Sequence, residues 1–438
     1  MLHCRRLLIP LFNALWIVAM LFFGMQEARA THALGSDLTY ECITTGPNAF
    51  NQYRVTLNVY RACNGINLPS TQRVSWRGSC GSGSVTARRQ VLQDITPICP
   101  TQQSSCGGGN GSFGIEQHTY VAIITVPPNC TDITFDWRLC CRNFAITTLQ
   151  NPGGEGMYIS TQLFNHQIVP CNNSPVFLNP PAAVTCVNNQ VFYNHGAVDY
   201  DGDSLSFSLT PCLDRAGDPV RYRAGFSATA PFGANAATID PLTGAITFTP
   251  TTTHIAVLCV LVEEYRNGVL IGTIRRDIQF RVLNCNNANP VVSGIVDSNG
   301  VTTVNYQVSS CFGNQLCFDI IGSDPNSNTS VLSMVYSGNI PGATFTIAGP
   351  GVPTANQLTG TFCWTPTIFD IGQHQFTVII QDDECPLVGS NTFTYIINII
   401  SNPNDPVDAG PDVRICRGSS TPLNATPTAT KDESINWS

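Results

Sequence analysis

Three aspartates at alternate positions form the feature of this sequence that is best suited to bind a ligand. Asp199, Asp201 and Asp203 lie in a short polar segment, and the glycine between the last two permits a tight bend. Carboxylates spaced in this way can converge on a hard cation, and Ca²⁺ takes about six to eight oxygen ligands. Glu263 and Glu264, at the end of a later predicted strand, would add oxygens to that shell. We therefore predict a calcium site on these five acidic residues.

A second acidic set recurs later in the chain. Asp324 and Asn326 replace the aspartate triplet, and Asp382, Asp383 and Glu384 replace the glutamate pair. Neither set has the spacing of an EF-hand loop, so ordinary solvated turns remain the alternative. Calcium bound here would have the affinity of extracellular modules, about 10⁻⁴–10⁻³ M, which is enough to stiffen a junction between modules.

The acidic sets belong to a longer pattern that the chain contains twice. The segment Leu242-Thr-Gly-Ala-Ile-Thr-Phe-Thr-Pro-Thr251 recurs as Leu358-Thr-Gly-Thr-Phe-Cys-Trp-Thr-Pro-Thr367, and each is interpreted as a turn followed by a strand. The two copies lie about one small domain apart. This spacing predicts two copies of one module in tandem rather than one large fold.

Residues suited to covalent catalysis are scarce. The one lysine is Lys431, near the end of the chain, which leaves none in the body for Schiff-base or P-loop chemistry. His195, His254 and His374 belong to no Gly-x-Ser-x-Gly or His-Glu-x-x-His motif. We expect no enzyme in this chain, although a triad assembled from distant residues remains the alternative.

Tryptophans offer a different kind of site, because aromatic rings stack on sugar rings. Trp76 and Trp137 are the candidates for a glycan-binding face. Trp364 lies in the repeated strand where the first copy has Phe248, so we expect it in a core.

The first 30 residues have the three parts of a secretory signal peptide. Arg5 and Arg6 precede an apolar run over Ala14–Gly24, and Ala28-Arg-Ala30 offers small residues for the protease. We predict cleavage after Ala30. An uncleaved membrane anchor is the alternative, but the apolar run is too short to span a bilayer. No later segment is long and apolar enough to cross a membrane, so we expect a mature chain that does not span one.

Cysteine usage agrees with export. Of the 19 cysteines, Cys4 lies in the predicted signal, and an oxidising compartment would join most of the others in disulfides. Zinc is the weaker interpretation, because no Cys-x-x-Cys occurs and the adjacent Cys140 and Cys141 are a poor chelate for a tetrahedral metal.

Short segments rich in Val, Ile, Thr, Phe and Tyr alternate with clusters of Gly, Pro, Asn and Ser. In Tyr53–Tyr60, apolar and polar residues alternate as in a half-buried strand. With 29 prolines, 36 glycines and no sustained helical period, the chain is predicted to be all-β, built of sandwiches. Polar links that contain proline place boundaries near residues 180, 286 and 403.

The repeated modules resemble the cadherin-like, immunoglobulin-like domains of bacterial surface proteins. Three elements of the first copy carry the resemblance: Asp199-x-Asp-Gly-Asp-Ser-Leu-x-Phe207, Ile239-Asp-Pro-Leu-Thr-Gly-Ala-Ile-Thr-Phe-Thr-Pro250, and a late strand pair that ends at Val282. The second copy keeps the turn Thr359-Gly…Trp-Thr-Pro366. The resemblance implies Ig-like/cadherin-like β-sandwich modules in tandem, which the disulfides expected from the cysteine usage would staple.

The two ends resemble the large exported proteins of gliding, Bacteroidetes-type bacteria. Thr31–Tyr40 and Tyr53–Gly65 are similar to their opening module, and Asp408–Cys416 is similar to the start of a PKD-like repeat. This implies export, often by a type IX system, and a chain that continues beyond Ser438. The domains expected are a signal peptide (1–30), a Cys-rich N-terminal β domain (31–180), two cadherin-like β-sandwiches (181–285 and 286–402) and an incomplete PKD/Ig-like module (403–438).

The net charge of the mature chain limits the classes of ligand that it is expected to bind. Removing residues 1–30 takes three of the 21 basic and one of the 29 acidic side chains, so the net charge falls from −8 to −10. This disfavours nucleic acid and anionic membranes and leaves a surface glycan or a protein as the ligand. We predict a secreted cell-surface stalk, scaffold or adhesin. A secreted carbohydrate-binding protein, or the accessory region of an exported enzyme whose catalytic domain follows this chain, are the alternatives.

Overall fold

The computed structural model confirms the all-β class. Across the described residues, the regular structure consists of strands and three short 3₁₀ turns, and no helix there could cross a membrane. The predicted signal peptide and the predicted module at 403–438 lie outside the described residues. The described residues are 33–46, 51–99, 101–111, 113–164, 169, 171–181, 184–234, 236–296, 305–326, 330–348, 357–385 and 387–401.

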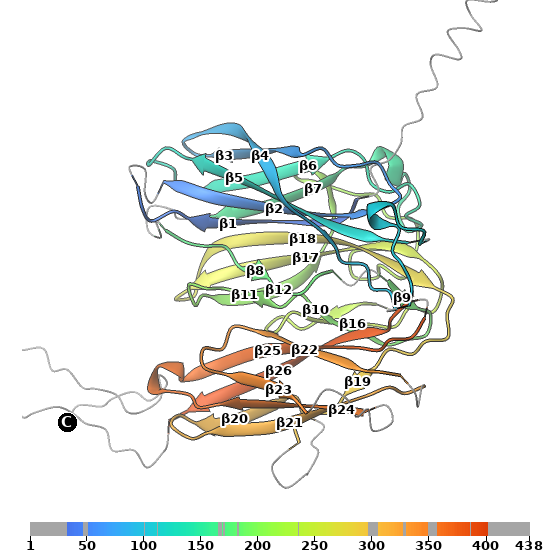
Figure 1. The fold of residues 1–438 in the computed structure, drawn as a ribbon. Helices are drawn as coiled ribbons and strands as arrows, with labels where there is room; N and C mark the ends of the chain where they lie inside the picture. The colour runs from blue at the N-terminus through green and yellow to red at the C-terminus, as the bar shows by residue number, and fades with distance from the viewer. Residues whose placement is uncertain are drawn as a thin grey trace, which may run out of the picture.

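Three bodies of strands are stacked along the long axis in Figure 1, in chain order. The largest hydrophobic clusters lie one in each body, within residues 33–163, 191–282 and 292–399. We call these bodies the N-terminal block, the first copy and the second copy. The predicted alternation is confirmed in the first body, where Tyr53, Val55, Leu57 and Val59 are fully buried and Arg54 is exposed.

The N-terminal block is built from seven long strands. Its hydrogen-bonded path runs β1-β2-β5-β4-β3-β6-β7, and its core lies between the two halves of that path. The elements are β1 (Ala33–Cys42), β2 (Gln52–Ala62), β3 (Thr71–Gly78), β4 (Gly81–Asp94), η1 (Cys106–Gly108), β5 (Ile115–Thr125), β6 (Ile133–Leu139), η2 (Pro152–Gly154) and β7 (Met157–Leu163).

The first copy packs a small sheet, β10-β16-β15, on the larger sheet that contains β12, β17 and β18. Its elements, with the short strands that flank it, are β8 (Val176–Phe177), β9 (Val184–Cys186), β10 (Val191–Asn194), β11 (Ala197–Val198), β12 (Ser204–Thr210), β13 (Leu213–Arg215), β14 (Asp218–Pro219), β15 (Thr238–Ile239), β16 (Ala245–Phe248), β17 (Ile255–Arg266) and β18 (Val269–Leu283).

The second copy repeats this pairing. Strands β22-β25-β26 match β12-β17-β18, strands β21-β24-β23 match β10-β16-β15, and β20 runs parallel to β26 as β9 does to β18. The elements are β19 (Val291–Val292), β20 (Gln307–Cys311), β21 (Leu316–Ser323), β22 (Ser333–Gly338), β23 (Thr344–Ile347), β24 (Gln357–Trp364), η3 (Ile368–Asp370), β25 (Gly372–Gln381) and β26 (Ser390–Ile400).

The repeated Thr-Gly element is a turn in one copy only. In the first copy Gly244 has φ +73° and follows a bend in which the Asp240 carboxylate accepts the backbone N–H groups of Leu242 and Thr243. In the second copy the turn prediction is wrong, because Gly360 lies within β24 and pairs with Ile320. A Cβ there would collide with the Phe345 ring, so this glycine serves close packing.

Strand β18 joins the first copy to the N-terminal block. One of its edges pairs with β17, and the other pairs in succession with β7 at 272–274, β1 at 276–278 and β9 at 281–283. The sheet therefore continues across the boundary predicted near residue 180. Which of the predicted domains fold on their own stays a prediction.

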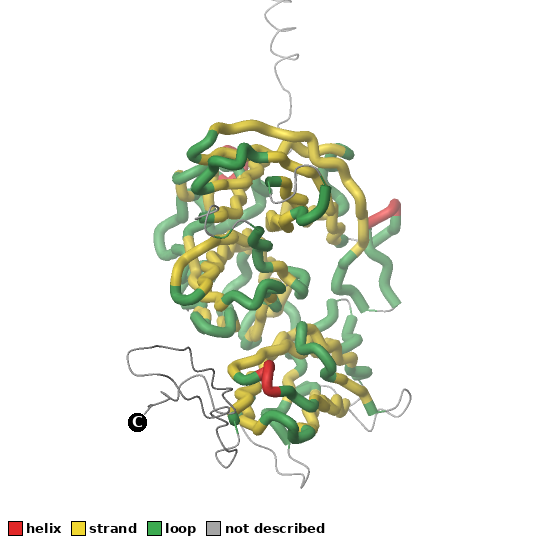
Figure 2. Tube along the Cα trace, turned by 90° about the vertical axis from the view of Figure 1, so that its left-hand side faces the viewer, coloured by secondary structure: helices red, strands yellow, loops and turns green. Residues whose placement is uncertain are grey.

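Among the described residues, eight disulfides support the predicted oxidised state. Cys99 and Cys385 are 286 residues apart, and their bond ties a strap of the N-terminal block (residues 95–114) to the second copy, beside the bridge between Ile98 and Leu387. Figure 2 shows the strap at the right, descending past the first copy. Cys311 is the one cysteine of the described residues that has no partner sulfur. The other bonds are Cys42–Cys171, Cys63–Cys106, Cys80–Cys130, Cys140–Cys141, Cys186–Cys285, Cys212–Cys259 and Cys317–Cys363.

Two buried ion pairs cross the same junction. The Arg142 guanidinium donates to both carboxylate oxygens of Asp277, at 3.1 and 2.6 Å, and both side chains are at most 1% exposed. The neighbouring Arg276 lies 3.4 Å from Asp37, again with both groups buried. Because adjacent strand residues point to opposite faces, the two pairs hold β18 from both sides.

The Arg142–Asp277 pair gives a first test. Replacing Asp277 with Asn leaves the Arg142 charge buried without a counter-charge, so we expect the free energy of unfolding to fall by about 3–5 kcal/mol. Urea unfolding of the mature, oxidised chain measures this. Glu41→Gln, in a pair whose side chains are 47% and 59% exposed, is the control and should change stability by about 1 kcal/mol or less. Equal effects of the two substitutions would contradict the role given to the buried pair.

Candidate functional site

The loop between β11 and β12 holds the first acidic set. The Asp199 carboxylate turns back into the loop, where its Oδ1 accepts the backbone N–H groups of Asp201 at 2.9 Å and Asp203 at 3.1 Å. Gly202 lies between them with φ +83°, a conformation that favours glycine. The expected tight bend is therefore present, and the Asp199 side chain holds it.

Three of the five predicted ligands come together. Single oxygens of Asp199, Asp203 and Glu264 all lie within 4.8 Å of one another. Glu264 is 1% exposed, and its Oε2 accepts no hydrogen bond; Oδ2 of Asp199 is likewise buried without a donor.

The other two predicted ligands are directed elsewhere. Asp201 accepts hydrogen bonds at 2.7 Å from the backbone and the side-chain amide of Asn173. Glu263 is adjacent to Glu264 on β17 and therefore points to the opposite face of the strand. It is not part of the cluster.

An arginine already neutralises part of the cluster. Arg266, the last residue of β17, donates to both oxygens of Asp203 at 2.7 and 2.5 Å and lies 3.5 Å from Asp201. The forked, two-point contact is the strongest kind of arginine–carboxylate pair. The prediction from sequence did not include this cation, although it lies two residues after Glu264.

Asparagines from the preceding linker complete the surroundings. Asn172 donates to Glu264 Oε1 at 2.6 Å and accepts from Arg266 at 2.7 Å. The second copy has the same arrangement, with Asn286 and Asn287 beside its acidic loop. Both pairs of asparagines directly follow a cysteine, so a repeated Cys-Asn-Asn motif was the available sequence signal.

Burial changes the protonation of the cluster. It raises the pKa of Glu264 to about 9, with a further rise from the charge of nearby Asp199. It also raises the pKa of Asp199 to about 6. Near neutral pH and without a metal, Glu264 is therefore protonated, and it must lose that proton before it can bind a cation.

The second acidic set is used mainly for backbone contacts. Asp382 Oδ1 accepts the backbone N–H groups of Glu384 and Gly389, and its Oδ2 accepts from Asn287 at 3.0 Å. Asp383 accepts the backbone N–H of Val331 at 2.8 Å.

At the start of that set, Asp324 accepts the backbone N–H of Asn326 at 3.0 Å, as Asp199 does in the first copy. The described residues here form no group of three ligand atoms like that around Glu264. A calcium site in the second copy stays a prediction that this geometry does not strengthen.

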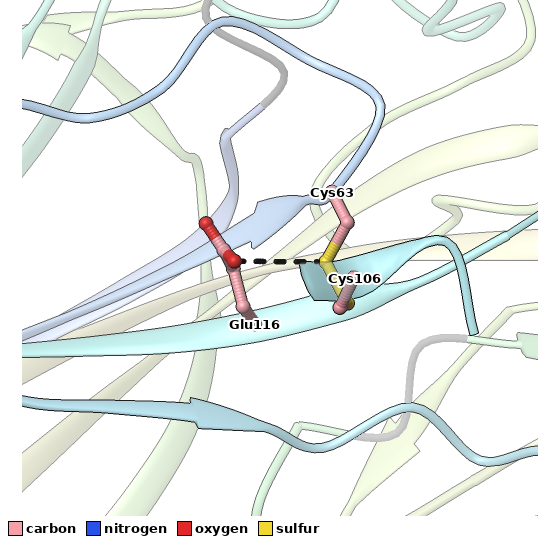
Figure 3. Close-up of side chains that lie close together, drawn as sticks. All are labelled: Cys63, Cys106 and Glu116. Carbon is pink, nitrogen blue, oxygen red and sulfur yellow. Dashed lines mark hydrogen bonds between the residues drawn. A yellow bond between two sulfur atoms is a disulfide. The ribbon is translucent and has the colours of Figure 1, made fainter. Parts of the chain in front are cut away.

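Two other groups of potential metal ligands contain disulfide sulfurs. In Figure 3, Cys63 and Cys106 are bonded to each other and lie beside Glu116, whose Oε2 is 3.8 Å from the Cys63 sulfur. A disulfide offers no thiolate, and the carboxylate of Glu116 is already paired with Arg61 and His118. In the third group, Cys212 and Cys259 form a disulfide and Asp277 is paired with Arg142, so these side chains are likewise not available to a metal.

The candidate tryptophans are not arranged as a sugar-binding face. Trp137 is 1% exposed and donates from its indole nitrogen to Gln72, so it belongs to the core and its assignment as a glycan contact is wrong. Trp76 is half-buried over Gly83 on the paired strand. Trp364 is 2% exposed, as predicted for a core residue.

Comparison with known proteins adds little. No protein-family model and no curated protein matches this sequence. Among solved structures, the chain is similar to the endo-fucoidan hydrolase MfFcnA4 from glycoside hydrolase family 107, with 14% identity and a TM-score of 0.18, over 72% of this chain and 39% of the hydrolase chain. A variant of that hydrolase is 14% identical to this chain, with a TM-score of 0.19, over 77% of this chain and 43% of the hydrolase chain. This chain spans about two fifths of their length, and a likeness this weak carries no argument.

The protonation of Glu264 predicts how stability varies with pH. An unfolded glutamate has a pKa near 4.5, whereas the folded value is about 9, so between these values the folded chain holds a proton that the unfolded chain releases. With chelator present, stability should therefore decline as pH rises through this window. Glu264→Gln removes the titrating group and should make the decline shallower, and thermal unfolding at several pH values measures it. The exposed Glu41→Gln should follow the parent chain; identical slopes for all three would contradict the assignment.

Proposed function

We propose that this chain is part of an exported, non-catalytic cell-surface protein of the gliding-associated type, and that it serves as a rigid scaffold or adhesin. In this proposal the two copies are cadherin-like, Ig-like sandwiches that space and orient a binding face. Their matched strand pairing supports that interpretation. The eight disulfides support an oxidising compartment outside the cytoplasm.

The observation that carries the proposal is the tie between the first and third bodies. The Cys99–Cys385 bond joins the strap of the N-terminal block to the second copy. The Arg142–Asp277 ion pair joins the first copy to the N-terminal block. Side-chain hydrogen bonds also link the copies, such as those from Asn179 to Thr377 and from Asn194 to Thr394. A chain tied in this way resists bending between modules, as a scaffold that presents a surface must.

Calcium is the ion that we propose for the first copy. Asp199, Asp203 and Glu264 would hold it, with the two oxygens that lack donors as its first ligands. The bound ion would supply positive charge to buried carboxylates, in place of the proton on Glu264. Since Arg266 already pairs with Asp203, the ion would add to the junction rather than create it.

Surface location is tested in the host. Antibody labelling and protease treatment of intact cells should detect the chain outside, and thiol alkylation before reduction should leave most cysteines unmodified. Deletion of the chain should reduce attachment or gliding. Recovery of the protein inside the cell with reduced thiols would contradict the proposal.

Calcium binding is tested on the mature chain. With a dissociation constant near 10⁻³ M, about 10 mM calcium should stabilise the fold by about 1.4 kcal/mol relative to chelator. Asp199→Asn should abolish this difference. Asp324→Asn, the corresponding change in the second copy, should lower stability equally with and without calcium. If calcium does not stabilise the parent chain, the calcium proposal is wrong and the loop is an Asx turn held by Arg266.

A further inference from the structure

A groove lined by both apolar and polar side chains follows the junction between the N-terminal block and the first copy, and it reaches Leu387 of the second copy. It lies away from the acidic cluster. It consists of two adjoining cavities of about 200 and 260 Å³, and Phe113 and Arg281 line both. Leu34 and Ala62 give the first cavity apolar walls, while the strap closes one side of the second.

Strand β18 supplies one wall through alternate residues. Gln279, Arg281 and Leu283 lie two apart on the face opposite the core of the first copy, and each lines one or both cavities. Gln279 is 5% exposed, and its Oε1 accepts no hydrogen bond. A buried amide oxygen without a donor is costly, so a ligand that donates to it would be favoured.

Arg281 supplies the charge. It is exposed, and its guanidinium lies 6.0 Å from the centre of the Phe113 ring. Arg281 belongs to none of the ion pairs among the described residues, although this is an acidic protein. Its planar fork is suited to a carboxylate or sulfate.

The other polar groups of the groove are amides, and no described lining residue is acidic. Asn64 and Asn143 line the first cavity, and Gln102 and Gln103 line the second. Amide side chains both donate and accept hydrogen bonds, as the hydroxyl groups of a sugar do, whereas a simple inorganic anion needs donors only. The groove therefore combines one cation with several neutral groups that can pair with hydroxyls.

We propose that this groove binds an acidic saccharide, whose carboxylate or sulfate contacts Arg281 and whose hydroxyls contact Gln279 and the neighbouring amides. This proposal names the class of ligand that the proposed adhesin would bind, and in that respect it rests on the proposed function. The site itself stands apart from Trp76 and from the calcium cluster.

The test measures binding of three tetrasaccharides to the mature, oxidised chain by calorimetry: tetragalacturonate, sulfated maltotetraose and neutral maltotetraose. One or both acidic sugars should bind at least about tenfold more tightly than the neutral one, because a hydrogen-bonded charge pair is worth about 1.5–3 kcal/mol. The preferred acidic sugar identifies the anionic group. Added salt should weaken binding, since Arg281 is exposed.

Matched variants locate the site. Arg281→Ala should abolish the preference for acidic sugar, and Gln279→Leu should weaken binding without lowering the melting temperature, because it removes an unsatisfied polar group. Arg54→Ala, an exposed arginine on β2, is the control and should bind as the parent does. Equal binding of neutral and acidic sugars, no effect of Arg281→Ala, or binding of inorganic sulfate as tight as that of the sugar would each overturn the proposal. These results do not depend on cell-surface location, which the labelling experiment tests separately.

Discussion

The structure depends on two consecutive residues of β18 that carry opposite charges and are both buried. Arg276 faces Asp37 on one side of the sheet, and Asp277 is held by Arg142 on the other. A buried charge without a partner is very unfavourable, so β18 is stable only in the position that supplies both counter-charges. Both partners belong to the N-terminal block. The pairing of β18 with β1 and β7, and hence the placement of the first copy, is therefore set by charge as well as by hydrogen bonds.

Local pattern predicted the elements well, and their long-range partners poorly. Alternation of side chains identified β2, because burial of one face leaves a period of two in the sequence. The repeat identified two modules with the same pairing. In contrast, the Cys99–Cys385 bond joins segments on either side of a whole module, and nothing local marks it. The turn predicted around Gly360 failed because a Thr-Gly pair suits both a bend and a crowded strand.

The acidic site shows the same division. The residue types identified Asp199, Asp203 and Glu264 correctly as neighbours, but the choice between Glu263 and Glu264 depends on which face of β17 is buried. Arg266 changes the chemistry most, since it offers the carboxylates a cation that belongs to the protein. Its role follows from the position of β17 against the loop, a tertiary relation that residue spacing does not encode.

The two copies solve one electrostatic problem in different ways. Each folds an aspartate back into its loop, Asp199 in one and Asp324 in the other. Each also places a buried acid nearby, Glu264 on β17 in the first copy and Asp382 directly after β25 in the second. The first copy neutralises this charge with a protein cation and a proton. The second distributes it over backbone N–H groups and the amide of Asn287. Burial still raises the pKa of Asp382, but its contacts with backbone N–H groups and Asn287 need no ion. We therefore expect a calcium response of this body to arise at the first copy, beside β18.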